Sequence, residues 1–422
     1  MFRWGSDGLA RNTLWALAGQ GSRVLVQGAY FVLVARLLGA DGYGAFAAAT
    51  ALFSIFAPFA NFGAGNLLIK RVATAPDDFS AAWGSALSTT ATYGTALTVA
   101  VAIVARLVLP VTVPTSLILA VAISDLLFAR IAELTSQAFQ GVERMGRTVY
   151  LQVLLNVARL IGIGTLGMVV RSPTPSLWGW FYLAGAVATA AYGLLVVKRE
   201  LGRARFAGLA GWSELREGLY FSTIISAHTI NNDIDKTLLA RFSTLDATGI
   251  YASAYRIMDV AFTPIRSLLY SSYARFFKHG ADGLAGTLAF VKRLLPVALA
   301  VSVGIFCALL VGSPLIPHIL GPQFATTAIT VRWLAIIPVF KTLHHLAGDA
   351  LSGAGYQGRR SFVQVLVAGA NVALNLVLIP RFSWKGALVT SIICDGLLAC
   401  ALWAVVWATR RQTKEELRPC PA

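Results

Sequence analysis

Apolar runs of about twenty residues recur from one end of this 422-residue chain to the other, and they constrain its fold more than any other feature. A helix of that length crosses a hydrocarbon core of roughly 30 Å. The mean hydropathy is +0.69 and only 13% of the residues are charged, whereas a soluble helical protein needs polar helix faces and charged connections. The sequence therefore predicts an all-α polytopic membrane protein.

Twelve of these runs are candidate transmembrane helices. Proline residues fall inside several of them, which a membrane helix tolerates because neighbouring helices can satisfy the freed backbone groups. The twelve predicted spans are 13–36, 45–69, 81–105, 115–139, 148–170, 177–197, 218–241, 248–274, 287–311, 324–350, 361–380 and 386–408.

The longest polar connection, KRELGRARFAGLAGWSELREG, lies between the sixth and seventh spans. It divides the chain near its middle. We therefore expect an N-terminal six-helix bundle at 1–197, a cytoplasmic linker at 198–217, and a C-terminal six-helix bundle with a cytoplasmic tail at 218–422.

The formal net charge of +16 is spread in small basic groups between the apolar runs. This distribution argues against nucleic acid as a partner and follows the positive-inside rule of membrane proteins. If the N-terminus is cytoplasmic, the basic linker residues Lys198, Arg199 and Arg203 are cytoplasmic too, and the opposite side keeps few basic residues, Arg106 and Arg171 among them. We therefore expect both termini in the cytoplasm.

The motifs of enzymes and of metal or cofactor sites do not appear in the sequence. The four cysteines show neither CxxC spacing nor a histidine pattern suited to zinc. Adjacent His344 and His345 point about 100° apart on a helix, which disfavours a two-histidine metal site. GIGTLG at 162–167 fits a dinucleotide motif but lies inside an apolar span with no preceding strand. We expect no metal, no cofactor and no enzymatic activity.

Two stretches recur in the same order about half a chain apart. A shift of 205 residues lays VARLLGADGYGAFAAA (34–49) over LARFSTLDATGIYASA (239–254). A shift of 212 residues lays AFQGVERMGRTVYLQVL (138–154) over ALSGAGYQGRRSFVQVL (350–366). We infer two repeats of six spans each. Because six is even, both repeats begin on the same side of the membrane, so they are parallel, and a central pathway is expected between them.

Basic side chains lie inside the predicted spans, where each charge costs at least about 2.5 kcal/mol. They are Arg23, Arg130, Arg159, Lys236, Arg256, Arg266 and Lys341. Local ion pairs along one helix would explain three of them: Arg130 with Glu133, Arg256 with Asp259, and Lys236 with Asp233. Arg23 and Arg159 have no acid within one turn. We therefore expect guanidinium groups without permanent acidic partners, which suit an anionic ligand such as a pyrophosphate.

The polar faces of the two repeats correspond. Under the 205-residue shift Arg23 aligns with His228, and Gln27 aligns with Asn232. The seventh span contains TINNDIDKTLLARF (229–242), whose polar residues recur at helical spacing on one face. This face either lines a cavity or joins the two halves by hydrogen bonds between helices, and the two roles can coexist.

Three parts of the chain resemble the polysaccharide (O-antigen or exopolysaccharide) flippases of the multidrug/oligosaccharidyl-lipid/polysaccharide exporter superfamily: ARLLGADGYGAFA; NNDIDKTLLARF with DATGIYASAYRI; and RWLAIIPVFKTL with LSGAGYQGRR. The resemblance covers nearly the whole chain. It implies two six-helix bundles that form a V around a cationic central cavity and open alternately to either side. It also implies export of undecaprenyl-diphosphate-linked oligosaccharide across the bacterial inner membrane, beside a polysaccharide polymerase or other assembly machinery.

The family resemblance and the polar faces of the predicted spans together indicate the candidate site. By position, Arg23, His228, Asp235 and Lys236 carry over from the family. The expected substrate-binding residues are Arg23, Gln27, Arg130, Gln152, Arg159, His228, Asn232, Lys236, Arg256, Arg266 and Lys341. The candidate carriers of a coupling H⁺ or Na⁺ are Glu133, Asp235 and Asp349. The sequence leaves open whether flipping is coupled to an ion or runs downhill.

Two other function classes stay open at this point. A drug/cation antiporter of the same superfamily should favour an acidic cavity, and the excess of arginine within the spans argues against it. A membrane polysaccharide polymerase or ligase should carry its catalytic residues on a sizeable periplasmic loop, whereas every predicted outer loop here is short.

Overall fold

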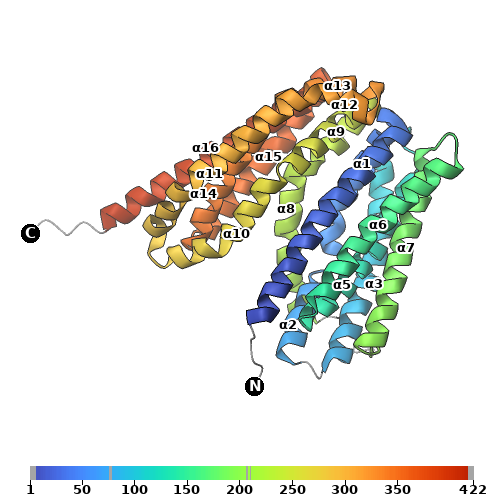
Figure 1. The fold of residues 1–422 in the computed structure, drawn as a ribbon, viewed down its shortest axis with the longest axis horizontal. Coiled ribbons are helices and arrows are strands. Elements are labelled where there is room, and N and C mark those ends of the chain that lie inside the picture. Colours follow the sequence, from blue (N-terminus) through green and yellow to red (C-terminus); the bar gives the residue numbers. More distant parts are fainter. Residues whose placement is uncertain (1–5, 76–77, 206–207, 210, 417–422) are drawn as a thin grey trace, which may run out of the picture. The chain divides into compact units, whose positions relative to one another are not determined.

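The computed structural model describes residues 6–75, 78–205, 208–209 and 211–416, and within these residues every regular element is helical (Figure 1). The chain forms two compact units, Met1–Gly249 and Ile250–Ala422. The predicted division into two six-span bundles joined by a linker at 198–217 stays a prediction.

Unit 1 contains eight α-helices and the beginning of a ninth, among the described residues. They are α1 (Ser6–Phe56), the short η1 (Ala57–Ala60), α2 (Ala64–Thr74), α3 (Phe79–Val108), α4 (Thr115–Ile123), the π-helical turn η3 (Ser124–Phe128), α5 (Ala129–Gly141), α6 (Met145–Val169), α7 (Pro175–Glu200), α8 (Trp212–Phe242) and the start of α9 (Leu245–Ala261). Helix α1 is broken at Gly39, whose φ of 73° lies in the left-handed region that favours glycine. The break separates the first two predicted spans.

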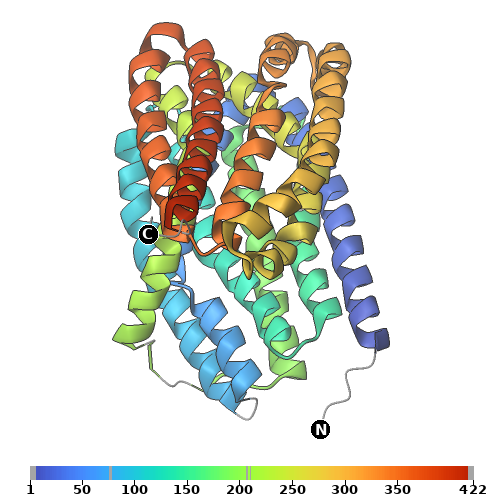
Figure 2. The ribbon, with the colours of Figure 1, turned by 90° about the vertical axis from the view of Figure 1, so that its left-hand side faces the viewer.

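Unit 2 contains the rest of α9 and seven further α-helices in its described part. They are α10 (Thr263–Gly280), α11 (Gly283–Gly312), η4 (Ser313–Leu315), α12 (Ile316–Leu320), η5 (Pro322–Phe324), α13 (Ala325–Leu334), α14 (Ile337–Gly353), α15 (Gln357–Phe382) and α16 (Trp384–Glu416). Helices α15 and α16 pack side by side, as the orange and red helices of Figure 2 show.

The helices follow the predicted spans. Seven helices among the described residues are long and apolar enough to cross a membrane, or eight if the bent pair Pro322–Leu334 and Ile337–Gly353 is one span. Three predicted spans fail that test for visible reasons. The span at 115–139 is divided by η3, the span at 248–274 is divided between α9 and α10, and α8 is too polar, with serine, threonine, histidine and asparagine as well as charged residues along it. The chain is a multi-pass membrane protein.

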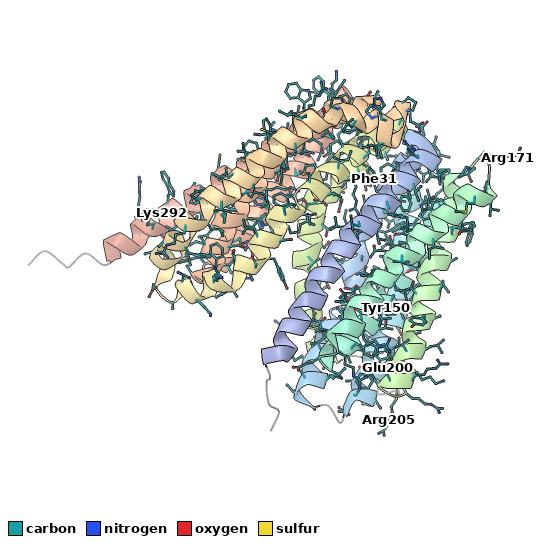
Figure 3. The ribbon with its side chains drawn as sticks, in the orientation of Figure 1. Phe31, Tyr150, Arg171, Glu200, Arg205 and Lys292 are labelled. Atoms are coloured by element: carbon teal, nitrogen blue, oxygen red, sulfur yellow. The ribbon has the colours of Figure 1, made fainter. Side chains whose placement is uncertain are left out.

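Large apolar side chains cover the outside of the helices. Met168 and Val169 on α6 and Leu107 on α3 are exposed, as are Val311 on α11 and Phe362 on α15. In water such surfaces would favour association, whereas hydrocarbon solvates them. Figure 3 places Arg171, in the connection between α6 and α7, at one end of the unit 1 helices, and Glu200 with Arg205 at the opposite end. A lipid-facing apolar surface therefore lies between charged ends.

The turn between α5 and α6 in unit 1 has the same geometry as the turn between α14 and α15 in unit 2. Glu143 has a φ of 59° and Gly355 a φ of 86°. The N–H of Arg144 donates to the Phe139 carbonyl over 2.9 Å, and the N–H of Tyr356 donates to the Leu351 carbonyl over 2.8 Å. Each pair of equivalent positions differs by 212 residues. The local structure thus confirms this part of the predicted repeat.

Candidate functional site

Two of the expected binding residues, Gln152 and Arg159 of the fifth predicted span, lie on α6, which packs against α1. The side chain of Gln27 on α1 donates from Nε2 to Oδ1 of Asn156 over 3.1 Å. Asn156 in turn donates from Nδ2 to the Gln152 carbonyl over 3.1 Å, and the Gln152 side chain is exposed. Gln27 of α1 and Gln152 of α6 are thus both linked to Asn156 of α6. Neutral amide groups of this kind can both donate hydrogen bonds to sugar hydroxyls and accept them.

Arg159 is held by a carboxylate, so the expectation that it lacks an acidic partner is wrong. Its Nη2 lies 2.8 Å from Oδ1 of Asp125, and both side chains are 17% exposed. The hydroxyl of Tyr182 donates to the same carboxylate, at 2.9 Å from Oδ1 and 3.1 Å from Oδ2. The guanidinium carbon lies 4.0 Å from the centroid of the Tyr182 ring. The search for a partner within one helical turn missed Asp125 because it lies 34 residues away, on η3.

Arg130 and Glu133 form the predicted local pair on α5. Nη1 of Arg130 lies 2.6 Å from Oε2 of Glu133. The pair is partly open, with the Arg130 side chain 28% exposed and that of Glu133 41% exposed. Nε of Arg130 is buried without a hydrogen-bond partner. Nε is thus out of a ligand's reach, but the exposed part of the guanidinium beside Glu133 is accessible to one.

The charged cluster on α8 is paired within the helix. Lys236 forms an ion pair with Asp233, as predicted, and donates to the Asn232 carbonyl over 3.0 Å. Asp235 is buried and accepts the backbone N–H of Lys236 over 2.8 Å.

Hydroxyl groups join the same helix to α1 and η1. Ser222 donates to the Pro58 carbonyl over 2.7 Å, and Ser226 donates to the Ile55 carbonyl over 2.8 Å. Both donors precede the stretch 229–242, so the interpretation of that stretch as a hydrogen-bonded link between the two halves stays a prediction. Its interpretation as a cavity lining stays a prediction.

The predicted cations of unit 2 also have partners. Arg266 contacts Asp259, the acid predicted for Arg256, at 3.0 Å. Nζ of buried Lys341 donates to the Tyr255 hydroxyl over 3.3 Å. Asp349 is paired with Arg360 of α15 at 3.0 Å, a contact that the sequence analysis missed because its two residues lie on different helices.

Two of the family-derived residues, Arg23 and His228, have side chains outside the part that the structure describes. No group of three or more potential metal ligands occurs within the described residues. The cations that the structure does describe are thus mostly paired rather than free, and Arg130 is the most accessible of those in unit 1 that the sequence selected.

The sequence of this chain is similar to those of known proteins. Residues 9–271 match the family described as polysaccharide biosynthesis protein. A probable low-salt glycan biosynthesis flippase of Haloferax volcanii is 22% identical over 268 residues, which are 63% of this chain and 56% of that relative. The match thus spans little more than half the length of that curated relative.

Solved structures show the same fold at low identity. An inward-facing multidrug resistance MATE family transporter of the MOP superfamily has a TM-score of 0.77 and 13% identity, with 94% of this chain and 96% of that chain covered. The lipid II flippase MurJ, in an inward closed conformation, has a TM-score of 0.74 and 13% identity, with 93% and 87% covered. The helical fold is therefore the one found in these transporters.

Proposed function

Because this chain belongs to the polysaccharide biosynthesis protein family, we propose that it is a flippase. Its substrate is an undecaprenyl-diphosphate-linked oligosaccharide, which it moves across the bacterial inner membrane for surface polysaccharide biosynthesis. The family match over residues 9–271 carries the proposal, and the transporter fold supports it.

The chemistry of unit 1 suits the head group of such a lipid. A diphosphate leaving water needs hydrogen-bond donors and positive charge, and a guanidinium supplies both in a planar fork. Nη1 of Arg130 is paired with Glu133, and the side chain is partly exposed, so the exposed part of the guanidinium can contact a phosphate. The amides of Gln27, Gln152 and Asn156 offer the neutral hydrogen bonds that sugars need.

The arginines therefore divide into two roles in this proposal. Arg130 contacts the diphosphate, whereas Arg159, held by Asp125 and Tyr182, positions the surrounding helices. The polyprenyl chain stays in the hydrocarbon of the bilayer throughout, so it adds no cost of transfer into water. In this proposal the two halves of the protein alternate between a state open to one side of the membrane and a state open to the other.

The purified protein in liposomes provides the test. Undecaprenyl diphosphate carrying a fluorescent disaccharide is exposed to a membrane-impermeant quencher, which reaches the inner-leaflet label only after flipping. The wild-type protein and Arg171→Ala, altered in the α6–α7 connection, should flip the lipid at equal rates, and Arg130→Ala should flip it at least about tenfold more slowly, the loss of roughly 1.4 kcal/mol.

Each rival function predicts a different outcome in that assay. A drug/cation antiporter would move a cationic dye and leave the glycolipid in place. A polymerase or ligase would lengthen or transfer the glycan. Absence of glycolipid flipping by the wild-type protein would overturn the proposal.

A further inference from the structure

A histidine and an aspartate meet inside unit 2, on two helices that pack together, and neither belongs to the site described above. Nε2 of His344 on α14 lies 3.6 Å from Oδ1 of Asp395 on α16, and each side chain is 8% exposed. Beside them, Trp403 of α16 donates from Nε1 to the Leu343 carbonyl over 3.2 Å. The pair is thus enclosed and held in place from both helices.

The distance between the two side chains is longer than a hydrogen bond to a charged group. An N–H of an imidazolium normally lies about 2.7–2.9 Å from a carboxylate oxygen. At 3.6 Å between Nε2 and Oδ1, the two groups attract each other when both are charged, yet the distance is too long for a hydrogen bond. Uptake of one proton by His344 would convert this contact into a charge-assisted hydrogen bond and draw α14 toward α16.

The charged groups around the pair act on His344 in opposite directions. On α14, Lys341 lies one turn before His344, and the ring of His345 lies 4.6 Å from that of His344. From α15, Arg360 faces the same region and is bound to Asp349 at 3.0 Å. Lys341 and Arg360 oppose a charge on His344, and Asp395 favours it.

The other helices packed against α14 are α10 and α11. Their buried residues are Ile265, Leu269, Ser272 and Phe276 on α10, and Leu284, Thr287, Val291, Ala298, Ser302 and Leu309 on α11. None of these residues is ionisable, so the balance of charge at His344 is set by the groups on α14, α15 and α16.

We propose that His344 and Asp395 form a proton-binding site within unit 2, and that the proton bound there is the ion that drives transport. The second half of this statement rests on the proposed function. Asp349, a carrier suggested by the sequence, forms an ion pair with the permanently charged Arg360 of α15 over 3.0 Å. The span formed by α13 and α14 is bent by 43° at the break before α14. Movement of α14 against α16 therefore does not require a continuous helix to bend.

Histidine-selective ¹⁵N NMR of the full chain in nanodiscs tests proton binding without any transport. The chain has five histidines, so His344→Gln identifies the signal of His344 by its loss. That signal should change from the imidazolium to the neutral imidazole as the pH is raised from about 5 to about 8, the range in which histidine normally changes charge. Asp395→Asn should lower the proton affinity about tenfold, because the neighbouring negative charge is gone. The control Asp246→Asn, an exposed acid of unit 1, should leave the titration unchanged.

Two NMR outcomes would overturn the proton site. One is a His344 signal that stays in a single charge state across this range. The other is a titration that Asp395→Asn does not alter.

Flipping assays in liposomes then test the coupling. If one proton moves per lipid, each unit of pH gradient should change the steady-state ratio of lipid between leaflets about tenfold in the wild-type protein. The ratio in His344→Gln should not respond to the gradient. A wild-type ratio that follows a sodium gradient instead would overturn the coupling. If the wild-type protein flips no glycolipid at all, the proposed function and the coupling fail together, while the NMR titration still decides the proton site.

Discussion

Gly44 and Gly249 each face the backbone of the other's helix at a reciprocal crossing of α1 and α9 within unit 1. A Cβ on Gly44 would lie under 3.0 Å from the Leu245 carbonyl oxygen, and a Cβ on Gly249 would lie under 3.0 Å from the Ala40 carbonyl oxygen. Gly44 and Gly249 differ by 205 residues, as do Ala40 and Leu245. The two copies of the repeated sequence therefore meet at equivalent glycines. At each glycine, a backbone carbonyl of the other copy leaves no room for a larger residue.

The first prediction concerns this crossing. Gly44→Ala or Gly249→Ala should lower the free energy of unfolding by about 1–3 kcal/mol, because a backbone carbonyl cannot move aside as a side chain can. Thermal unfolding in detergent measures the change. Gly28→Ala is the matched control on α1, because its Cβ would meet nothing within 4 Å. It should be neutral or stabilising by up to about 1 kcal/mol. Equal melting temperatures for Gly44→Ala and Gly28→Ala would contradict the close approach.

The second prediction concerns pH dependence near the same crossing. Asp246 lies between the seventh and eighth predicted spans, and its partial burial, together with the negative charge of Asp41, raises its pKa. The folded protein therefore holds this proton to a higher pH than the unfolded chain does. As pH rises from the ordinary aspartate pKa through the raised one, the folded state loses stability.

Asp246→Asn should remove this part of the pH dependence and make the protein more stable at neutral pH. Melting temperatures measured from pH 4 to 7 would show a smaller decline in the variant than in the wild-type protein. A decline that is unchanged or steeper in the variant would show that Asp246 is not its source.

The third prediction tests the Arg159–Asp125 pair as a structural anchor. Arg159→Met alone should cost about 3 kcal/mol of stability, because it leaves a carboxylate at low exposure without its cation. The double variant Arg159→Met with Asp125→Leu should recover much of that loss, because no unpaired charge remains. A double-mutant cycle on unfolding free energies measures the coupling, and strictly additive losses would argue against a direct interaction.

The fourth prediction separates substrate binding by Arg130 from simple pairing. Glu133→Gln frees the guanidinium from its carboxylate, so it should strengthen binding of a diphosphate lipid, whereas Arg130→Gln should weaken it. Titration of undecaprenyl diphosphate into the purified protein in nanodiscs measures both. If the pair served only the fold, the two variants would shift the affinity in the same direction.

The fifth prediction uses the repeated turn. Glu143 adopts a left-handed conformation that its counterpart Gly355 adopts without strain. Glu143→Gly should therefore stabilise the protein by about 1 kcal/mol, and Gly355→Ala should destabilise it by a similar amount. Opposite shifts of the melting temperature are expected, and shifts of the same sign would show that side-chain contacts, rather than φ, decide this turn.

Several features of this protein follow from the order of its residues alone. Long apolar runs predict the spans because one helix satisfies its own backbone and needs only hydrocarbon around it. The internal repeat predicts the turn after α5 from the turn after α14. The pairs Arg130–Glu133 and Lys236–Asp233 are visible in the sequence because residues three apart always share a helix face.

Only the tertiary structure decided which of the remaining charges are neutralised. Asp125 reaches Arg159 across 34 residues, Asp349 reaches Arg360 across 11, and Asp395 reaches His344 from another helix. Periodicity along one helix carries no information about the rotation of its neighbour, and that rotation determines which side chains face each other. The sequence therefore determined where charges enter the membrane, and the packing of the helices determined which of them remain available to a ligand or a proton.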